Sequence, residues 1–213
     1  MNRDEEKTLQ KALLDHVVQG EAGKTYKLKA AAGFIEKYLS GGIVLDVGFR
    51  GHVAGSVPIT PYAVGVDLDY PGYDGLTLPF HDETVDAIFS SHVLEHVENY
   101  KKVIQDWHRV LKIGGFIVCV VPHQFLYEKR SHPPSKFNGD HKRFYTPSSL
   151  LHEFEESLQP NSYRVRHLCD NDLWFDYGLG PHEHSRGCYE IELVIEKIKI
   201  PQWWIETDEH GSQ

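Results

Sequence analysis

Four short apolar runs, separated by stretches with a helical period, constrain the fold of this chain most strongly. The runs lie at residues 43–47, 63–67, 85–90 and 116–121. Runs of this kind are typical of strands that are buried on both faces of a parallel sheet. Parallel strands that alternate with helices form right-handed crossovers, so the pattern predicts an α/β fold with a doubly wound, mainly parallel sheet. Ligands of such sheets bind beyond the carboxyl ends of the strands.

The flanking segments predict helices. Residues 3–39 carry apolar side chains near the helical spacing, with a break at residues 20–23, so we expect two amphipathic helices there. The glycine pair at 41–42 ends the second of them. A further helix is expected over residues 103–111, and the glycine pair at 114–115 is expected to stop it at the C-cap position.

The C-terminal third has a different pattern. Residues 148–158 form a plausible helix, with Thr146 as N-cap and Pro147 at the first helical position. Residues 163–168 and 189–198 alternate between apolar and polar side chains, which predicts paired antiparallel strands with one wetter face.

A single domain over residues 1–213 accommodates these elements. We expect a helical cap, a ligand-binding core, and a region of loops and C-terminal strands, over residues 1–40, 41–122 and 123–200 respectively. Trp203 and Trp204 are expected to pack back on the body of the domain.

Composition narrows the possible partners and the compartment. Lys and Arg total 22 against 31 Asp and Glu, and the formal charge of −9 gives no general attraction toward nucleic acid or anionic membranes. The apolar runs are shorter than the roughly 18 residues that span a bilayer. The three cysteines are widely spaced and the acidic N-terminus is followed by no apolar segment, so we expect a soluble cytoplasmic protein. The number of subunits stays open.

Two features follow the first two strands directly. Residues 44–51 form a buried strand that ends in a turn with two glycines, which permit positive φ and close approach of the backbone to a ligand. Asp67 ends the next strand, where a carboxylate can accept hydrogen bonds from a ribose diol; Asp69 and Asp74 are alternatives. The glycine spacing differs from the dinucleotide-binding fingerprint, which disfavours an enzyme that uses NAD or a nucleotide sugar.

The middle of the chain carries three motifs in close succession. Residues 78–86 read LPFHDETVD, residues 90–97 read SSHVLEHV and residues 107–115 read WHRVLKIGG. In combination, these motifs resemble the class I S-adenosylmethionine-dependent methyltransferases, especially a branch that acts on small molecules. The resemblance covers residues 43–122. It implies a Rossmann-like sheet with an antiparallel last strand, and methyl transfer from a sulfonium to a nucleophile.

The resemblance also implies that S-adenosylmethionine is the cofactor and that residues at the ends of the first three strands contact it. The matching residues are Asp46, Gly48 and Gly51 for the methionine part, Asp67 for the ribose hydroxyls, Asp74, Gly75 and Leu76 for the adenine, and Ser90, Ser91 and His92 at the strand end nearest the sulfur.

The chain departs from the family in its nucleotide-binding half. The first two strands are separated by residues 49–61, which number 13 and include two prolines. Residues 69–84, 16 in all, stand where the family normally has a helix, a strand and a helix. Phe49 and Arg50 replace small residues in the first loop. We therefore expect a fold that is abbreviated in the cofactor half.

Methyl transfer to a hydroxyl requires alignment in a dry site and a base, and a histidine that titrates near neutral pH suits that role. His123 and His141 are the catalytic candidates because both lie on loops over the expected ligand face. His92 and His96 lie at one sheet end, and a hydrogen-bonded capping role is expected for His96.

Two further segments allow alternatives. Residues 127–143 contain five cations, which are either a solvated loop or a recognition site for an acceptor with phosphate, carboxylate or sugar groups. His182, His184 and Cys188 lack a clear fourth ligand for zinc, so we predict no metal site and favour a mobile loop that covers the ligand site.

The sequence therefore predicts an S-adenosylmethionine-dependent methyltransferase whose N-terminal helices cap the acceptor pocket. The expected acceptor is a small molecule that offers a hydroxyl of a sugar, lipid-linked or secondary-metabolite compound, with anionic or sugar-containing molecules among the candidates. The rival hypothesis is a noncatalytic binding or scaffold protein with a degenerate cofactor site, because fold analogy alone does not establish catalysis.

Overall fold

A six-stranded sheet forms the centre of the molecule. The computed structural model describes residues 3–51, 53 and 55–201, and its strands lie in the order β2-β1-β3-β4-β6-β5. The strands are β1 (Val44–Val47), β2 (Val64–Val66), β3 (Val85–Ser91), β4 (Leu111–Pro122), β5 (Tyr163–Asn171) and β6 (Glu190–Lys197). The first four are parallel, and β6 runs antiparallel to both β4 and β5. The predicted α/β fold, with its antiparallel last strand, is confirmed.

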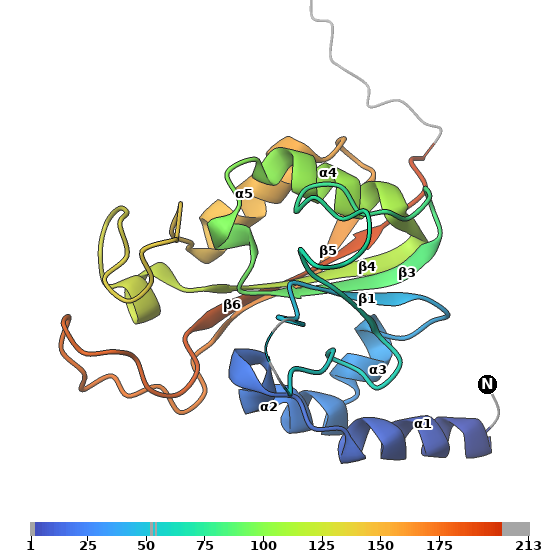
Figure 1. Cartoon of the computed structure of the whole chain (residues 1–213), viewed down its shortest axis with the longest axis horizontal. Coiled ribbons are helices and arrows are strands. Elements are labelled where there is room, and N and C mark those ends of the chain that lie inside the picture. Colours follow the sequence, from blue (N-terminus) through green and yellow to red (C-terminus); the bar gives the residue numbers. More distant parts are fainter. Residues whose placement is uncertain (1–2, 52, 54, 202–213) are drawn as a thin grey trace, which may run out of the picture.

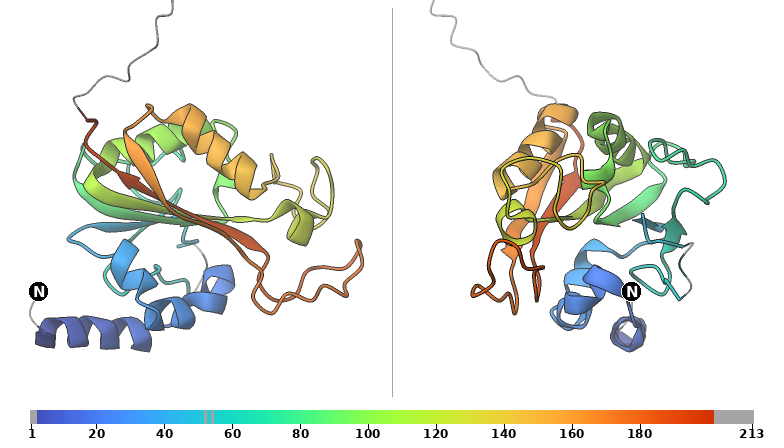
Figure 2. Two further views of the ribbon diagram at one scale, coloured as in Figure 1. Left: turned by 180° about the vertical axis from the view of Figure 1, so that it is seen from behind. Right: turned by 60° about the vertical axis from the view of Figure 1, so that its left-hand side comes forward.

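Helices cover both faces of this sheet (Figure 1). One face carries α1 (Arg3–Asp15), α2 (Gly20–Ala31) and α3 (Phe34–Tyr38), and the other carries α4 (Tyr100–Val110) and α5 (Pro147–Ser157). Figure 2 shows the same three layers from two further directions. Each helical layer shares a separate apolar core with the sheet, because successive strand side chains point to opposite faces.

The helices on the second face form as their sequences predict. In α4 the residues Val103, Ile104, Trp107 and Val110 are fully or almost fully buried at helical spacing. Helix α5 begins with the predicted Thr146 cap, whose side chain accepts a hydrogen bond from the backbone N–H of Ser149.

The N-terminal prediction of two helices is wrong, since three helices form and α2 begins at Gly20 where a break was expected. Gly23 lies inside α2, and packing requires a glycine there because a Cβ would lie 2.3 Å from the carbonyl oxygen of Val18. This glycine therefore lets the preceding turn approach the helix. The second break falls at Gly33, whose φ of +74° requires the left-handed region.

The glycine pair at 114–115 does not cap α4 as predicted. The helix ends at Val110, and β4 starts at the next residue. The register between β3 and β4 shifts next to this pair, and a Cβ on Gly115 would lie 2.8 Å from the carbonyl oxygen of Asp86. The glycines therefore serve an irregular strand pairing instead of a helix terminus.

The predicted wetter face of the last strand is also wrong. Glu190 and Glu192 are only 1% and 4% exposed, because β6 lies between two other strands and α2 covers its expected outer face. Lys29 of α2 places its Nζ 2.6 Å from Glu192 Oε1. This ion pair gives the second buried carboxylate a partner.

The shortened half of the fold is confirmed. Within residues 67–84, which link β2 to β3, the structure has neither helix nor strand. Trp203 and Trp204 lie outside the described residues, so their expected packing is untested. Among the residues that are described, no helix combines the length and the apolarity that a bilayer crossing needs.

Candidate functional site

One edge of the sheet gathers the residues that carry chemistry. The carboxyl ends of β1, β2, β3 and β4 meet there, together with the start of β6. The long loops before α5 and before β6, yellow and orange in Figure 1, extend from this edge. Sequence prediction placed the ligand at the same edge.

The turn after β1 depends on three glycines. Gly48 has a φ of +83°, and a Cβ on it would lie 2.1 Å from Val93 Cγ2 in the turn after β3. A Cβ on Gly51 would lie 2.3 Å from the Phe49 ring, and a Cβ on Gly65 would lie 2.5 Å from it. The Phe49 ring therefore has room because Gly51 and Gly65 carry no side chains. The turn after β1 and the turn after β3 are packed together where Gly48 meets Val93.

Asp67 joins the ends of β1 and β2. Its Oδ2 accepts a hydrogen bond of 2.8 Å from the backbone N–H of Arg50, and its Oδ1 accepts one of 2.8 Å from Leu68. Asp74 makes a similar turn, in which Oδ1 accepts from the N–H groups of Leu76 and Thr77 at 2.9 and 2.6 Å. These backbone hydrogen bonds hold the pKa of Asp74 below its ordinary value.

The Asp46 side chain is buried against the sheet and does not lie at the surface of the turn after β1. It is 5% exposed, and its Oδ2 accepts a 2.6 Å hydrogen bond from the backbone N–H of Ile59. Burial raises the pKa of this carboxyl to about 7; the Ile59 N–H opposes the rise and the charge of Asp67 adds to it. Asp46 therefore fixes the segment that leads into β2.

The Asp46→Asn variant should become more stable relative to the wild type as pH rises. The folded-state pKa of about 7 lies above the ordinary value of 3.8, so the folded state favours the protonated carboxyl. The stabilisation that the Asp46 carboxyl gives to the folded protein is therefore fully present below its pKa in the unfolded state. It is lost as pH rises through its pKa in the folded state. Urea unfolding should show the gap widening by about 2 to 4 kcal/mol between roughly pH 4 and pH 8. Parallel profiles would show that Asp46 titrates normally.

His92 lies at the end of β3 among carboxylates. It has a φ of +57°, its Nε2 lies 3.1 Å from Glu190 Oε1, and its Nδ1 lies 3.6 Å from Glu95 Oε1. Burial lowers the pKa of His92, but the Glu190 hydrogen bond and the charges of Glu95 and Glu190 together raise it above its ordinary value. Nearby, the Ser90 hydroxyl is buried and finds no hydrogen-bond partner among the described residues.

The two predicted catalytic histidines lie in different surroundings. His123 accepts a 3.0 Å hydrogen bond at Nδ1 from the backbone N–H of Phe125, and its Nε2 lies 3.5 Å from Asp170 Oδ1. Burial lowers the pKa of His123, while the charge of Asp170 opposes that change. Because Nδ1 accepts, Nε2 carries the proton in the neutral ring.

His141 lies in a buried cluster instead. Its Nδ1 hydrogen-bonds to the fully buried Glu128, and its Nε2 lies 4.0 Å from Glu95 Oε1. His96 belongs to the 3₁₀ helix η1 (Leu94–His96), and the centroid of its ring lies 4.8 Å from that of the His141 ring. The structure therefore brings together His92, His96 and His141, and places His123 directly after the neighbouring strand β4.

Sequence reasoning missed the carboxylates of this cluster. Glu95 lies inside the SSHVLEHV motif, Glu128 in the π-helical turn η2 (Gln124–Glu128), and Glu190 at the start of β6. For Glu95 and Glu190 the available signal was an acidic residue among apolar neighbours, which is uncommon unless the charge has a partner; Glu128 stands beside Lys129 and Arg130 and gave no such signal.

The cations of the loop at 127–143 hold other loops in place. Lys129 Nζ donates to the carbonyl oxygen of Glu183 at 2.9 Å, and Lys136 Nζ donates to that of Pro181 at 3.0 Å. Arg143 Nη1 and Nη2 donate to the carbonyl oxygens of Leu94 and Glu98 at 3.2 and 3.0 Å. These contacts assign Lys129, Lys136 and Arg143 a structural role, which favours neither a solvated loop nor an anion site.

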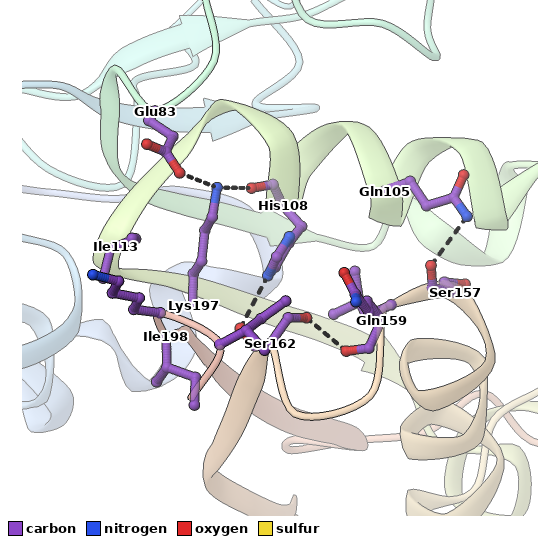
Figure 3. A pocket seen from close by; sticks show the side chains of 12 residues that line it. Glu83, Gln105, His108, Ile113, Ser157, Gln159, Ser162, Lys197 and Ile198 are labelled. Carbon is purple, nitrogen blue, oxygen red and sulfur yellow. Dashed lines mark hydrogen bonds and ion pairs between the residues drawn. The ribbon is translucent and has the colours of Figure 1, made fainter. Parts of the chain in front are cut away.

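A cavity of about 530 Å³ lies at the opposite edge of the sheet, between the ends of α4, α5 and β6 (Figure 3). Lys197 crosses it and donates to the carbonyl oxygens of His108 and Leu111 at 3.0 and 2.8 Å. Its Nζ also lies 3.3 Å from Glu83 Oε1. The ammonium is thus occupied by structural contacts, and the candidate site remains at the other edge.

Comparison with known proteins relates the chain to methyltransferases. A family described as methyltransferase domain matches residues 60–119. The chain is 37% identical to a demethylmenaquinone methyltransferase of Alkalihalophilus pseudofirmus, over 55% of this chain and 53% of that protein. It is 33% identical to a tRNA (carboxymethyluridine(34)-5-O)-methyltransferase of Arabidopsis thaliana, over 45% of this chain and 28% of that protein. The chain thus spans about half the length, or less, of these relatives.

A solved structure with the same fold is an S-adenosylmethionine-dependent methyltransferase from Mesorhizobium loti. It has a TM-score of 0.52 and 14% identity, and the match covers 79% of this chain and 97% of that one. At this identity the likeness concerns the fold, while the domain match covers β2, β3, α4 and most of β4. Together these matches show a methyltransferase-domain resemblance over residues 60–119 and the fold of an S-adenosylmethionine-dependent methyltransferase over most of the chain.

Proposed function

We propose that this protein transfers the methyl group of S-adenosylmethionine to a hydroxyl of a small molecule. The observation that carries the proposal is the overlap between the methyltransferase-domain match and the sheet edge that holds Asp67, Ser90 and His92. The Gly48 turn adjoins the same edge. The rival hypothesis is a noncatalytic protein with the same fold. It does not explain why an accessible histidine lies among carboxylates at this edge of the sheet.

The residues at this edge fit the cofactor. Asp67 ends β2 where the ribose hydroxyls of a nucleoside need acceptors, and the Asp74 turn fixes the Gly75 and Leu76 backbone beside it. The partnerless Ser90 hydroxyl offers a polar contact inside the site. When bound, the cofactor supplies a methyl group on a positively charged sulfur. The carboxylates near His92 give the edge a negative field that favours such a cation.

We assign proton acceptance at the acceptor hydroxyl to His92 because a base must touch its substrate. The side chain of His92 is 22% exposed, compared with 11% for His123 and 3% for His141. His96 is more exposed, at 34%, but among the described residues it has no hydrogen bond to a carboxylate that would orient its ring. Glu190 holds the His92 ring from within the sheet, in the way that a carboxylate orients a catalytic imidazole. The sequence-based expectation gave this role to His123 and His141, which are less exposed than His92.

The names of the relatives include both a quinone-type and a tRNA substrate, so the acceptor class must be identified by experiment. Purified protein is incubated with methyl-labelled S-adenosylmethionine and, separately, with total tRNA, a demethylated quinol and a pool of sugars and phenols. We expect label in a small-molecule arm. Label in the tRNA arm alone would contradict the proposed acceptor class, and absence of label from every arm would contradict the proposed activity.

The His92→Ala variant should lower kcat by about 100- to 10,000-fold, the usual effect of losing a general base. Its affinity for S-adenosylmethionine should change little by comparison. His81→Ala, at an exposed histidine outside the site, is the matched control and should keep the wild-type rate. A wild-type rate in His92→Ala, together with a loss in His123→Ala, would move the base to His123.

A further inference from the structure

Three groups of side chains bring possible metal-ligating atoms within 4.8 Å of one another. They are Glu95, His96 and His141; Glu21, His92 and Glu190; and His167, Cys169 and Glu192. In the third group the Lys29 ammonium already neutralises Glu192. In the second, the His92 and Glu190 side chains already hydrogen-bond to each other. The first group differs because, among the described residues, its carboxylate accepts no hydrogen bond from a side chain and has no cation as near as Lys29 is to Glu192.

Glu95 is fully buried, and neither of its carboxylate oxygens has a hydrogen-bond partner among the described residues. A buried carboxylate is costly unless it is paired, hydrogen-bonded or bound to a metal. Around Oε1 the imidazole nitrogens of His92, His96 and His141 lie at 3.6, 3.9 and 4.0 Å, too far for hydrogen bonds. The atoms surround this oxygen without touching it.

We propose that Glu95, His96 and His141 bind a divalent transition-metal ion of the zinc type. Zinc bound to nitrogen and oxygen in a tetrahedral site separates its ligand atoms by about 3.4 Å, given bonds of about 2.1 Å. The distances of 3.9 and 4.0 Å from Glu95 Oε1 to the two Nε2 atoms are about half an ångström longer. Two imidazoles and one carboxylate also match the donor set of zinc and related ions.

The surroundings of the cluster support a metal ligand at His141. Its Nδ1 is held by Glu128, so Nε2 carries the lone pair in the neutral ring, and this atom lies 4.0 Å from Glu95 Oε1. Histidines that bind metals almost always place their other nitrogen against such a carboxylate or carbonyl. The backbone N–H of Lys142 donates to the carbonyl oxygen of Glu95 at 2.7 Å, which ties the His141 loop to η1. The ligands are therefore held in place by contacts of their own.

The cluster also allows entry and an open coordination position. The His96 side chain is 34% exposed, whereas Glu95 is fully buried, so an ion can enter past the His96 ring. Three protein ligands leave a fourth position for water or a substrate oxygen, the arrangement of catalytic rather than structural zinc sites. The site stands on these contacts alone and does not depend on the proposed methyl transfer.

The test uses full-length, tag-free protein freed of metals with a chelator. Zn²⁺ is titrated calorimetrically, and Co²⁺ is followed by its visible absorption. We expect one ion per chain, a rise in Tm on adding Zn²⁺, and affinity losses of at least about 100-fold in Glu95→Gln and His96→Ala. Glu128→Gln should weaken binding by about 10- to 100-fold. The control with both His167→Ala and Cys169→Ser removes another candidate cluster and should bind as the wild type does.

No Zn²⁺ binding by folded wild-type protein would overturn the proposal. Wild-type affinity in His96→Ala, or loss of binding in the His167 and Cys169 control, would also overturn it. If Glu95→Gln fails to fold, His96→Ala decides the question because its side chain is partly exposed. The cofactor titration is a separate measurement, so failure of one proposal is distinguishable from failure of the other.

Discussion

The Gly48→Ala variant is expected to be destabilised by about 2 to 5 kcal/mol and to lose cofactor affinity. Two costs add: positive φ for a non-glycine residue, about 1 to 2 kcal/mol, and overpacking, about 1 to 3 kcal/mol. The added Cβ would lie 2.1 Å from Val93 Cγ2, so the turn after β1 must move away from the turn after β3. The free energy of unfolding from urea titration measures the effect.

Two further variants separate the costs. Gly33 has a similar φ of +74°, but a Cβ there meets nothing within 4 Å, so Gly33→Ala should show only the backbone cost. In a Val93→Ala background the Cβ added by Gly48→Ala no longer clashes with Val93. The loss in free energy of unfolding caused by Gly48→Ala should then fall to about 1 to 2 kcal/mol. Equal penalties for the alanine variants of Gly48 and Gly33 would show that the two turns are not packed as described.

The sequence predicted the sheet because its signal is local. All four apolar runs became parallel strands, and the two alternating segments near the C-terminus paired as expected. Residues 69–84 are too few for the elements that methyltransferases of the resembling family have there, and this comparison of lengths predicted the missing elements. Local patterns of hydrophobicity and length carry this information without any knowledge of the packing.

Glycines were harder to interpret, because their role depends on distant neighbours. Gly23 and Gly115 looked like helix breaks, yet each lies against a carbonyl oxygen that only the folded chain brings there. Glu190 and Glu192 were expected on a wet face because the position of β6 within the sheet is not visible in its own residues. Tertiary context overrides the local pattern at such positions.

The proposed cofactor residues and the acidic cluster also differed in predictability. Gly48 and Asp67 directly follow strands, so their place at the ligand edge followed from the fold class. The partners of His92 did not, because Glu190 is 98 positions away in the sequence. His96 and His141 likewise meet only through a loop closure. The sequence therefore indicated which histidines lie near the edge but not which carboxylates hold them.

Loss of the Asp67 carboxylate should weaken cofactor binding by about 10- to 150-fold, since a hydrogen bond to a charged group contributes about 1.5 to 3 kcal/mol. The loss should be larger if the Arg50 backbone loosens when its acceptor is removed. Asp69→Ala, at the exposed carboxylate two residues on, is the matched control and should bind as the wild type does.

Calorimetric titration with S-adenosylmethionine and S-adenosylhomocysteine tests the central claim most directly. Folded wild-type protein and Asp69→Ala are predicted to bind both ligands at one site per chain, and Asp67→Ala is predicted to bind them far more weakly. Absence of binding of both ligands to folded wild-type protein, or equal affinities in Asp67→Ala and the wild type, would contradict the assignment of this sheet edge as the cofactor site.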